Sequence, residues 1–142
     1  MQIRHFIHPW MLLLSLITAA AHAEYAVIVS TGNANASLNK TAITRIFLGK
    51  ASSFPDGSKA IPVDQSEGSA SREAFNSHVL EKSASQLKAY WSRLIFTGKG
   101  TPPQESGSDT DVKKLIANNP NLVGYIDSSQ VASSVTVVFR FP

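Results

Sequence analysis

The chain has 142 residues, 43% of them hydrophobic, and a formal net charge of +3, which suits a domain with a modest core but provides no clustered basic surface for nucleic acid. It contains no cysteine, so disulfides, thiolate metal sites and cysteine nucleophiles are excluded. Three of the four histidines fall within residues 1–23, which leaves His78 and excludes a multi-histidine metal site; we expect neither a metal nor a cofactor.

The N-terminal segment has the pattern of a secretory signal peptide. Arg4 supplies a positive charge, an apolar run follows over residues 11–17, and a small-x-small cleavage pattern ends at Ala23. The run is too short for a membrane-spanning helix, although an uncleaved anchor is the alternative. We therefore expect cleavage after Ala23, export to the periplasm, and a single domain over residues 24–142.

The first half of this domain alternates strands with helices. Residues 25–30 are apolar at successive positions, which predicts a strand buried on both faces and favours a parallel sheet. A turn at 31–33 precedes a helix with an apolar face at 43–47, begun by Asn39 and stopped by Gly49.

A short strand at 61–63 leads into a loop rich in serine and glycine and then into two helices. The first helix places His78 on its apolar face, beside Phe75 and Val79, so we expect this histidine to be packed rather than catalytic. The second carries apolar residues at helical spacing from Leu87 to Ile95, the strongest such pattern in the chain. We expect Trp91 of this stripe to lie in the core.

The last third begins with a long loop over residues 97–107. A helix follows, opened by a capping box of Ser108 and Asp111. Residues 122–126 predict a strand, and the alternating residues of 135–141 predict a final strand with one covered face. The order β-α-β-α-α-α-β-β indicates a three-layer or two-layer α/β domain with a mixed sheet flanked by helices.

The loop before the second predicted helix has the chemistry of an oxyanion site. The first N–H groups of a helix lack internal partners, and the helix dipole favours negative charge there. The hydroxyls of Ser69 and Ser71 are potential donors, while Gly68 and Ala70 allow close approach to the backbone. Ordinary helix capping by Ser66 or Ser69 is the alternative interpretation.

Three segments resemble a known family in the same order along the chain. Residues 66–71, Ser-Glu-Gly-Ser-Ala-Ser, resemble the Ser-Asp-Gly-Ser-Gly-Thr loop of periplasmic phosphate-binding proteins of ABC transporters. Residues 38–50 resemble that family's Ile-Phe-x-Gly-Lys segment, and residues 117–126 its Gly-Tyr-Val strand. Residues 63–65, 91–103 and 123–125 are also similar to short stand-alone periplasmic proteins of this kind. The resemblance implies a single-lobe type 2 periplasmic-binding-protein-like domain.

The resemblance also implies a binding site, from which some of the family's ligand residues are absent. Its ligand residues would be Ser66, Gly68, Ser69, Ala70, Ser71 and Arg72, holding phosphate or a similar small oxyanion. The family's phosphate-binding arginine falls at Gln65, and its first ligand loop has no counterpart here. A second wall would have to come from Thr31, Gly32 and Asn33, from a second copy in a homo-oligomer, or from a partner protein. Arg72 either binds the anion or pairs with a neighbouring carboxylate.

Two functions follow as hypotheses. The first is non-enzymatic binding of phosphate or a similar oxyanion as an accessory to a membrane transporter or sensor receptor. The alternative is a periplasmic interaction or sensor module that has kept the fold and lost the ligand. A hydrolase is disfavoured because no nucleophile motif accompanies His78. Residues 97–101 are not a Walker loop, since Arg93 stands where its first glycine is required.

Overall fold

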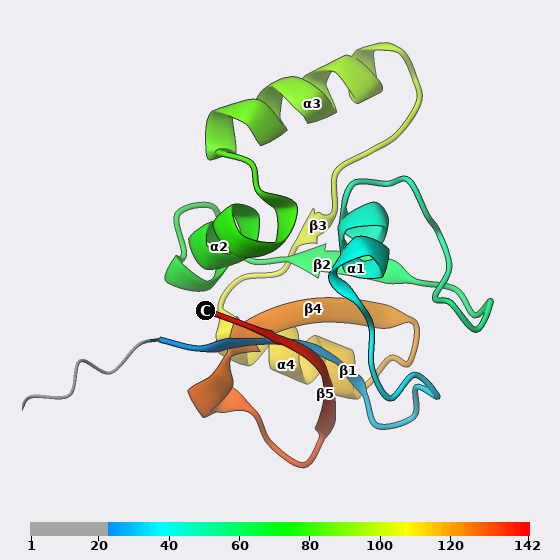
Figure 1. Cartoon of the computed structure of the whole chain (residues 1–142), viewed down its shortest axis with the longest axis vertical. Helices are drawn as coiled ribbons and strands as arrows, with labels where there is room; N and C mark the ends of the chain where they lie inside the picture. Colours follow the sequence, from blue (N-terminus) through cyan, green and yellow to red (C-terminus); the bar gives the residue numbers. More distant parts are fainter. Residues whose placement is uncertain (1–22) are drawn as a thin grey trace, which may run out of the picture.

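The computed structural model describes residues 23–142, so the predicted signal peptide lies almost wholly outside the described residues (Figure 1). The sheet contains five strands: β1 Tyr25–Ser30, β2 Ile61–Asp64, β3 Gln104–Glu105, β4 Leu122–Asp127 and β5 Val135–Phe141. The helices are α1 Lys40–Phe47, α2 Ala70–Phe75 with its π-helical continuation Asn76–Leu80, α3 Ala84–Phe96, α4 Asp109–Ala117 and a 3₁₀ turn Ser128–Gln130.

The sheet is mixed, as predicted, with the strand order β3-β2-β4-β1-β5. β2 runs parallel to β3 and β4, whereas β1 runs antiparallel to both β4 and β5. The expectation that β1 is a parallel strand is therefore wrong. β1 is buried throughout because it lies inside the sheet with helices on both faces, and this burial does not depend on strand direction.

Helices cover both faces of the sheet and form two cores. On one face Val27 and Val29 pack with α1 and α2, whereas on the other Ala26 and Ile28 pack with α4 (Figure 1). The strand therefore alternates between the two cores, as strand geometry requires. The result is a three-layer α/β domain with a mixed sheet, the predicted fold class.

Gly124 sets the distance between α4 and the sheet. A Cβ atom at this position would lie 2.6 Å from Ile116 Cδ1 and 2.9 Å from Val112 Cγ1. Both distances are shorter than van der Waals contact, so only glycine allows α4 to pack this closely on β4.

The predicted helix ends are confirmed where they depend on local chemistry. The Asn39 side chain accepts a hydrogen bond from Ala42 N–H at the start of α1, and Gly49 has the left-handed φ of 71° after its end. Ser108 and Asp111 form the expected capping box of α4.

Two predicted apolar faces are interrupted by irregular backbone. The π-helical turns after Phe75 change the helical phase, so Val79 stays buried while His78 is exposed, contrary to our expectation. In β5 the register shifts because Val138 is an extra residue opposite β1, and it is buried in place of its neighbours. The expectation of one covered face is therefore wrong: Val135 and Val137 pack in one core, and Phe139 and Phe141 pack in the other.

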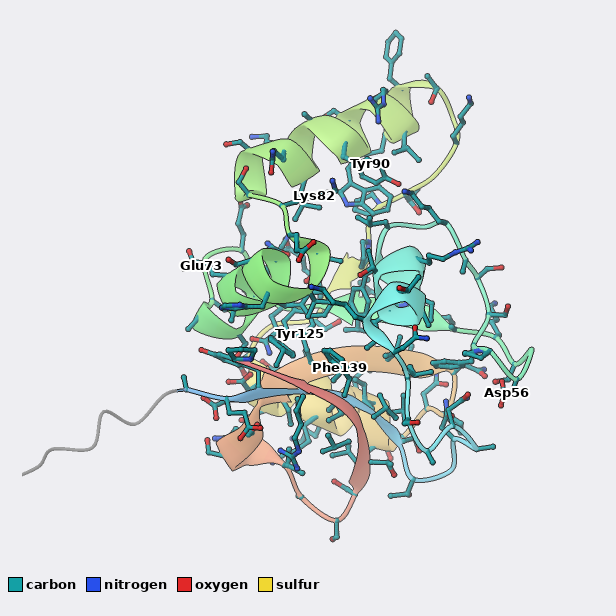
Figure 2. The ribbon with its side chains drawn as sticks, viewed as in Figure 1. Asp56, Glu73, Lys82, Tyr90, Tyr125 and Phe139 are labelled. Carbon is teal, nitrogen blue, oxygen red and sulfur yellow. The ribbon has the colours of Figure 1, made fainter. Side chains whose placement is uncertain are left out.

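α3 stands apart from the sheet, beyond α1 and α2 (Figure 1). Only Leu87 of its thirteen residues is buried, and Trp91 is half-buried, so the expectation of Trp91 in the core is wrong. Tyr90 extends from α3 toward the body of the molecule (Figure 2), where its hydroxyl donates to Leu48 O at 2.6 Å. The ring of Trp91 rests on Gly49, where an added Cβ would lie 3.2 Å from Cη2.

Among residues 23–142 we find no helix with the length and apolar character needed to cross a membrane. The same residues contain no group of three or more histidine and carboxylate side chains placed to hold a metal ion.

Candidate ligand-binding site

The predicted ligand loop lies at the carboxyl end of β2 and leads directly into α2. Ser66 O accepts from Ser69 N–H, and Gly68 adopts a φ of 85° that favours glycine. No atom lies within 4 Å of an added Cβ on Gly68, so this turn faces open space. The structure thus places Ser66, Gly68 and Ala70 on an exposed surface.

Ser69 is the N-cap of α2. Its hydroxyl accepts from Arg72 N–H at 3.1 Å and donates to Gln65 Oε1 at 3.1 Å. Both hydrogen-bonding functions of this hydroxyl are therefore used within the protein, as the capping interpretation predicted.

Asp109 accepts hydrogen bonds from both Gln65 and Ser71. The sequence resemblance places these two residues at phosphate-binding positions of the similar family. The amide Nε2 of Gln65 lies 2.7 Å from Asp109 Oδ1, and the hydroxyl of Ser71 lies 2.7 Å from the same oxygen. The backbone N–H of Asp127 is a third donor, at 3.0 Å. Gln65 and Ser71 are buried, at 1% and 3% exposure, so a carboxylate of the chain itself occupies the acceptor position for these donors.

Arg72 is paired with carboxylates rather than turned toward open solvent. Its Nη1 donates to Glu105 Oε1 at 2.5 Å and to Gln65 O at 2.9 Å, and its Nε lies 3.8 Å from Asp64 Oδ1. Of the two predicted roles for Arg72, the geometry agrees with pairing to a neighbouring carboxylate.

Asp64, at the end of β2, is a largely buried carboxyl of this site whose pKa is raised. Burial raises its pKa, and the hydrogen bond from the Tyr125 hydroxyl and the charge of Arg72 only partly oppose this effect. Burial and the neighbouring Asp64 charge also raise the pKa of Tyr125. Tyr125 lies in the interior (Figure 2), stacked on Phe75 with ring centroids 4.2 Å apart, so the pair fixes α2 on β4.

Residues 31–33 do not lie opposite the loop. β1 runs antiparallel to β4, which is parallel to β2, so the end of β1 and the end of β2 lie at opposite ends of the sheet. The turn packs instead on Pro120, whose carbonyl accepts from Asn33 Nδ2 at 2.9 Å. The structure therefore does not bring Thr31, Gly32 and Asn33 to the predicted site as its second wall.

A groove of about 630 Å³ lies between the loop and α3. Leu87, Trp91 and Ile95 of α3 line one side, and the α2 region lines the other with Arg72 and Glu73. Asp64, Glu67 and Glu105 add three more carboxylates. The groove is thus largely apolar along α3, apart from Lys88 and Ser92, and mainly acidic on the opposite side.

Sequence reasoning did not identify Asp64, Glu105 or Asp109 as part of this site. Asp109 lies in the first turn of a correctly predicted helix, but its three donors come from distant parts of the chain. Glu105 belongs to the two-residue strand β3, inside a segment predicted as loop. No local pattern marks either contact, because each depends on the sheet order.

The described domain has the fold of one lobe of the substrate-binding proteins of phosphate ABC transporters. It superposes with a TM-score of 0.66 on a protein described as such from Clostridium perfringens, solved with bound phosphate, at 25% identity. The TM-score is also 0.66 with an ABC-type phosphate transport receptor from Vibrio cholerae at 19% identity, and 0.62 with PstS from Borrelia burgdorferi at 12%. These likenesses confirm the predicted resemblance and fold class.

The chain spans less than half the length of these proteins. The matches cover 82% of this chain but 44%, 45% and 46% of the three structures, in the same order. No protein-family model matches the chain, and no curated protein matches it in sequence.

Proposed function

We propose that the chain is a non-enzymatic periplasmic module that acts by contacting a partner protein and does not bind phosphate. The observation that carries this proposal is the inward use of the loop's side-chain donors. Ser71 and Gln65 donate to Asp109, and Arg72 donates to Glu105. An external anion would have to replace these bonds, and the two made to Asp109 by buried donors are of a kind worth about 1.5–3 kcal/mol each.

The charges around the loop also oppose a phosphate dianion. Four carboxylates, Asp64, Glu67, Glu73 and Glu105, line the groove, with Arg72 and Lys88 as the cations. Phosphate sites in proteins normally place arginine, lysine and backbone N–H groups toward the ligand. The excess of carboxylates favours cationic partners.

Oxyanion binding at Ser66, Gly68, Ser69, Ala70, Ser71 and Arg72 remains the second candidate. One observation favours it: the backbone N–H groups of Ala70 and Ser71 open α2 and have no acceptor within the helix. The similar structure from Clostridium perfringens holds phosphate. In this case the chain would be a transport or sensing accessory that needs a membrane transporter or receptor, or a second copy, to complete its half-site.

Thermal melting in phosphate separates the two candidates. At a phosphate concentration one hundred times its Kd, binding would stabilise the fold by about 2.7 kcal/mol, which raises Tm by several degrees. We expect no change in Tm between millimolar phosphate and chloride of equal ionic strength.

The Ala70→Glu variant provides the matched test. It places a negative charge at the start of α2, where acidic side chains are tolerated, and Ser77→Glu is the control at an exposed site farther along the same helical segment. A rise of Tm in phosphate that Ala70→Glu abolishes and Ser77→Glu retains would overturn the interaction-module proposal in favour of oxyanion binding.

A further inference from the structure

The groove between α3 and α2 has an apolar wall that the protein itself leaves uncovered. Ile95, which lines it, is 54% exposed; Phe96, the next residue of α3, is 93% exposed and lies outside the groove lining. Among the described residues, the other exposed large hydrophobic residue is Leu115 on α4, which is 41% exposed. Large apolar side chains gathered on one exposed helix indicate an interaction surface, whereas a single one does not.

α3 is held at a few points rather than packed along its length. Tyr90 bonds to Leu48, Trp91 rests on Gly49, and Leu87 is buried. A π-helical turn followed by Glu81, which has a left-handed φ of 54°, connects it to α2. A helix supported in this way keeps an apolar face open beside the groove.

Pro102 and Pro103 extend the apolar surface at the mouth of the groove. Both precede β3, and proline rings present rigid apolar surface at little entropic cost. The apolar part of the groove therefore runs from α3 to the segment that enters the sheet.

The charges on the opposite wall define the complementary ligand. Glu67 and Glu73 are exposed, while Arg72 is already paired with Glu105. Lys88 of α3 is the other cation of the groove, against four carboxylates. A phosphate ester or an anionic lipid headgroup would be repelled by this wall, whereas a lysine or arginine side chain would be attracted.

We propose that this groove binds a segment of a partner polypeptide that presents apolar side chains and lysine or arginine. The proposal rests on the interaction role proposed above and names the partner's chemistry. Apolar side chains of the segment pack against Trp91, Ile95 and the two prolines, and its cationic groups pair with Glu67 and Glu73. The fit combines an apolar centre with a charged rim, the arrangement common in protein interfaces.

The test uses two synthetic peptides on the isotopically labelled protein. One alternates leucine with lysine, and the other replaces every lysine with glutamate. We expect the lysine peptide to shift the amide resonances of α3 and residues 102–105, and to bind at least about tenfold more tightly than the glutamate peptide. Equal binding of the two peptides, or no binding of either, would overturn the proposal.

Matched variants locate the contact. Ile95→Ser and Glu73→Gln should each weaken the lysine peptide several-fold, whereas Leu115→Ser and Glu24→Gln, exposed positions outside the groove, should not. Unchanged melting curves would show that the folds are intact. If Ile95→Ser and Glu73→Gln left peptide binding unchanged, the groove would be rejected as the binding site, but a partner-binding role on another face would remain. A rise of Tm in phosphate would instead reject the partner-binding role itself.

Light scattering tests whether a second copy of the chain, rather than a partner, occupies the groove. We expect a particle of one chain at the concentrations used for the titration. A dimer that Ile95→Ser dissociates would overturn the proposal, because the groove would then hold a second copy of the chain.

Discussion

At the scale of single residues, Asp109 determines how the loop's hydroxyl and amide groups are used. Its Oδ1 accepts from the Gln65 side chain, the Ser71 hydroxyl and the Asp127 backbone. The three donors come from the β2–α2 loop, the first turn of α2 and the end of β4. The carboxylate of Asp109 therefore holds these three segments together and takes the position at which a bound anion would accept hydrogen bonds from them.

Asp64 should make the stability of the fold depend on pH. Its pKa is raised in the folded state, mainly by burial, so the unfolded chain releases this proton at lower pH. The contribution of Asp64 to the free energy of unfolding is therefore greatest below the unfolded pKa near 3.8 and falls as pH rises through the folded pKa. Urea denaturation of Asp64→Asn should show a stability that improves relative to wild type as pH rises across this window.

Asp56 supplies a control of opposite sign. Hydrogen bonds from Ser58 lower its pKa, so its contribution is present above pH 3.8 and is lost as pH falls through the folded pKa. Asp56→Asn should accordingly lose stability relative to wild type as pH rises. If the two variants had the same pH dependence, the raised pKa assigned to Asp64 would be wrong.

Gly124→Ala should destabilise the domain by about 1–3 kcal/mol, the usual cost of overpacking a core. The new methyl group meets Ile116 and Val112 well inside contact distance, so α4 must move away from the sheet. Gly32→Ala is the comparison, because its Cβ would meet Pro120 at an ordinary 3.4 Å. Chemical denaturation measures both, and equal stability of the two variants would contradict the role given to Gly124.

Local residue roles were predictable, whereas contacts across the fold were not. Asn39 and Ser108 were identified as caps because a cap depends on residues within one helical turn. The contact between Gln65 and Asp109 links residues 44 positions apart, so it requires the strand order before it can be inferred. The pairing of Arg72 with Glu105 could not be predicted for the same reason, since these residues are 33 positions apart.

At the scale of elements, α3 is the clearest departure from sequence reasoning. Its apolar stripe correctly predicted a helix, but periodicity does not reveal whether the chain covers the apolar face. α2 and β5 show a second limit, since a π-helical turn and a bulge each change the phase of a regular pattern. The existence of a helix or strand was therefore easier to predict than which of its residues are buried.

The different packing of α2 and α3 can be measured. Phe75→Ala removes a fully buried ring that stacks on Tyr125 and should cost about 3–5 kcal/mol. Trp91→Ala removes a half-buried ring and should cost clearly less, because the groove already exposes part of it. A larger loss from Trp91→Ala, measured by denaturant unfolding, would show that α3 belongs to the main core.

At the scale of the whole molecule, the order of elements was predicted except for the two-residue strand β3, and the direction of one central strand was not predicted. Alternating strands and helices indicate layers, and both cores are present as expected for a three-layer domain. Strand direction depends on the connections, and β1 pairs antiparallel with neighbours that come last in the chain. The likeness to one lobe of longer proteins accordingly describes an arrangement of elements, while the chemistry of the site belongs to its own residues.

The bulge at Val138 has a consequence for aggregation. β5 is an edge strand of seven residues, long enough to act as a template for strands of other molecules. Val138 O, however, accepts a hydrogen bond from Leu38 N–H at 3.0 Å, so the segment before α1 covers the edge at the bulge. The other edge, β3, has only two residues. Both borders of the sheet thus carry features that disfavour intermolecular β pairing.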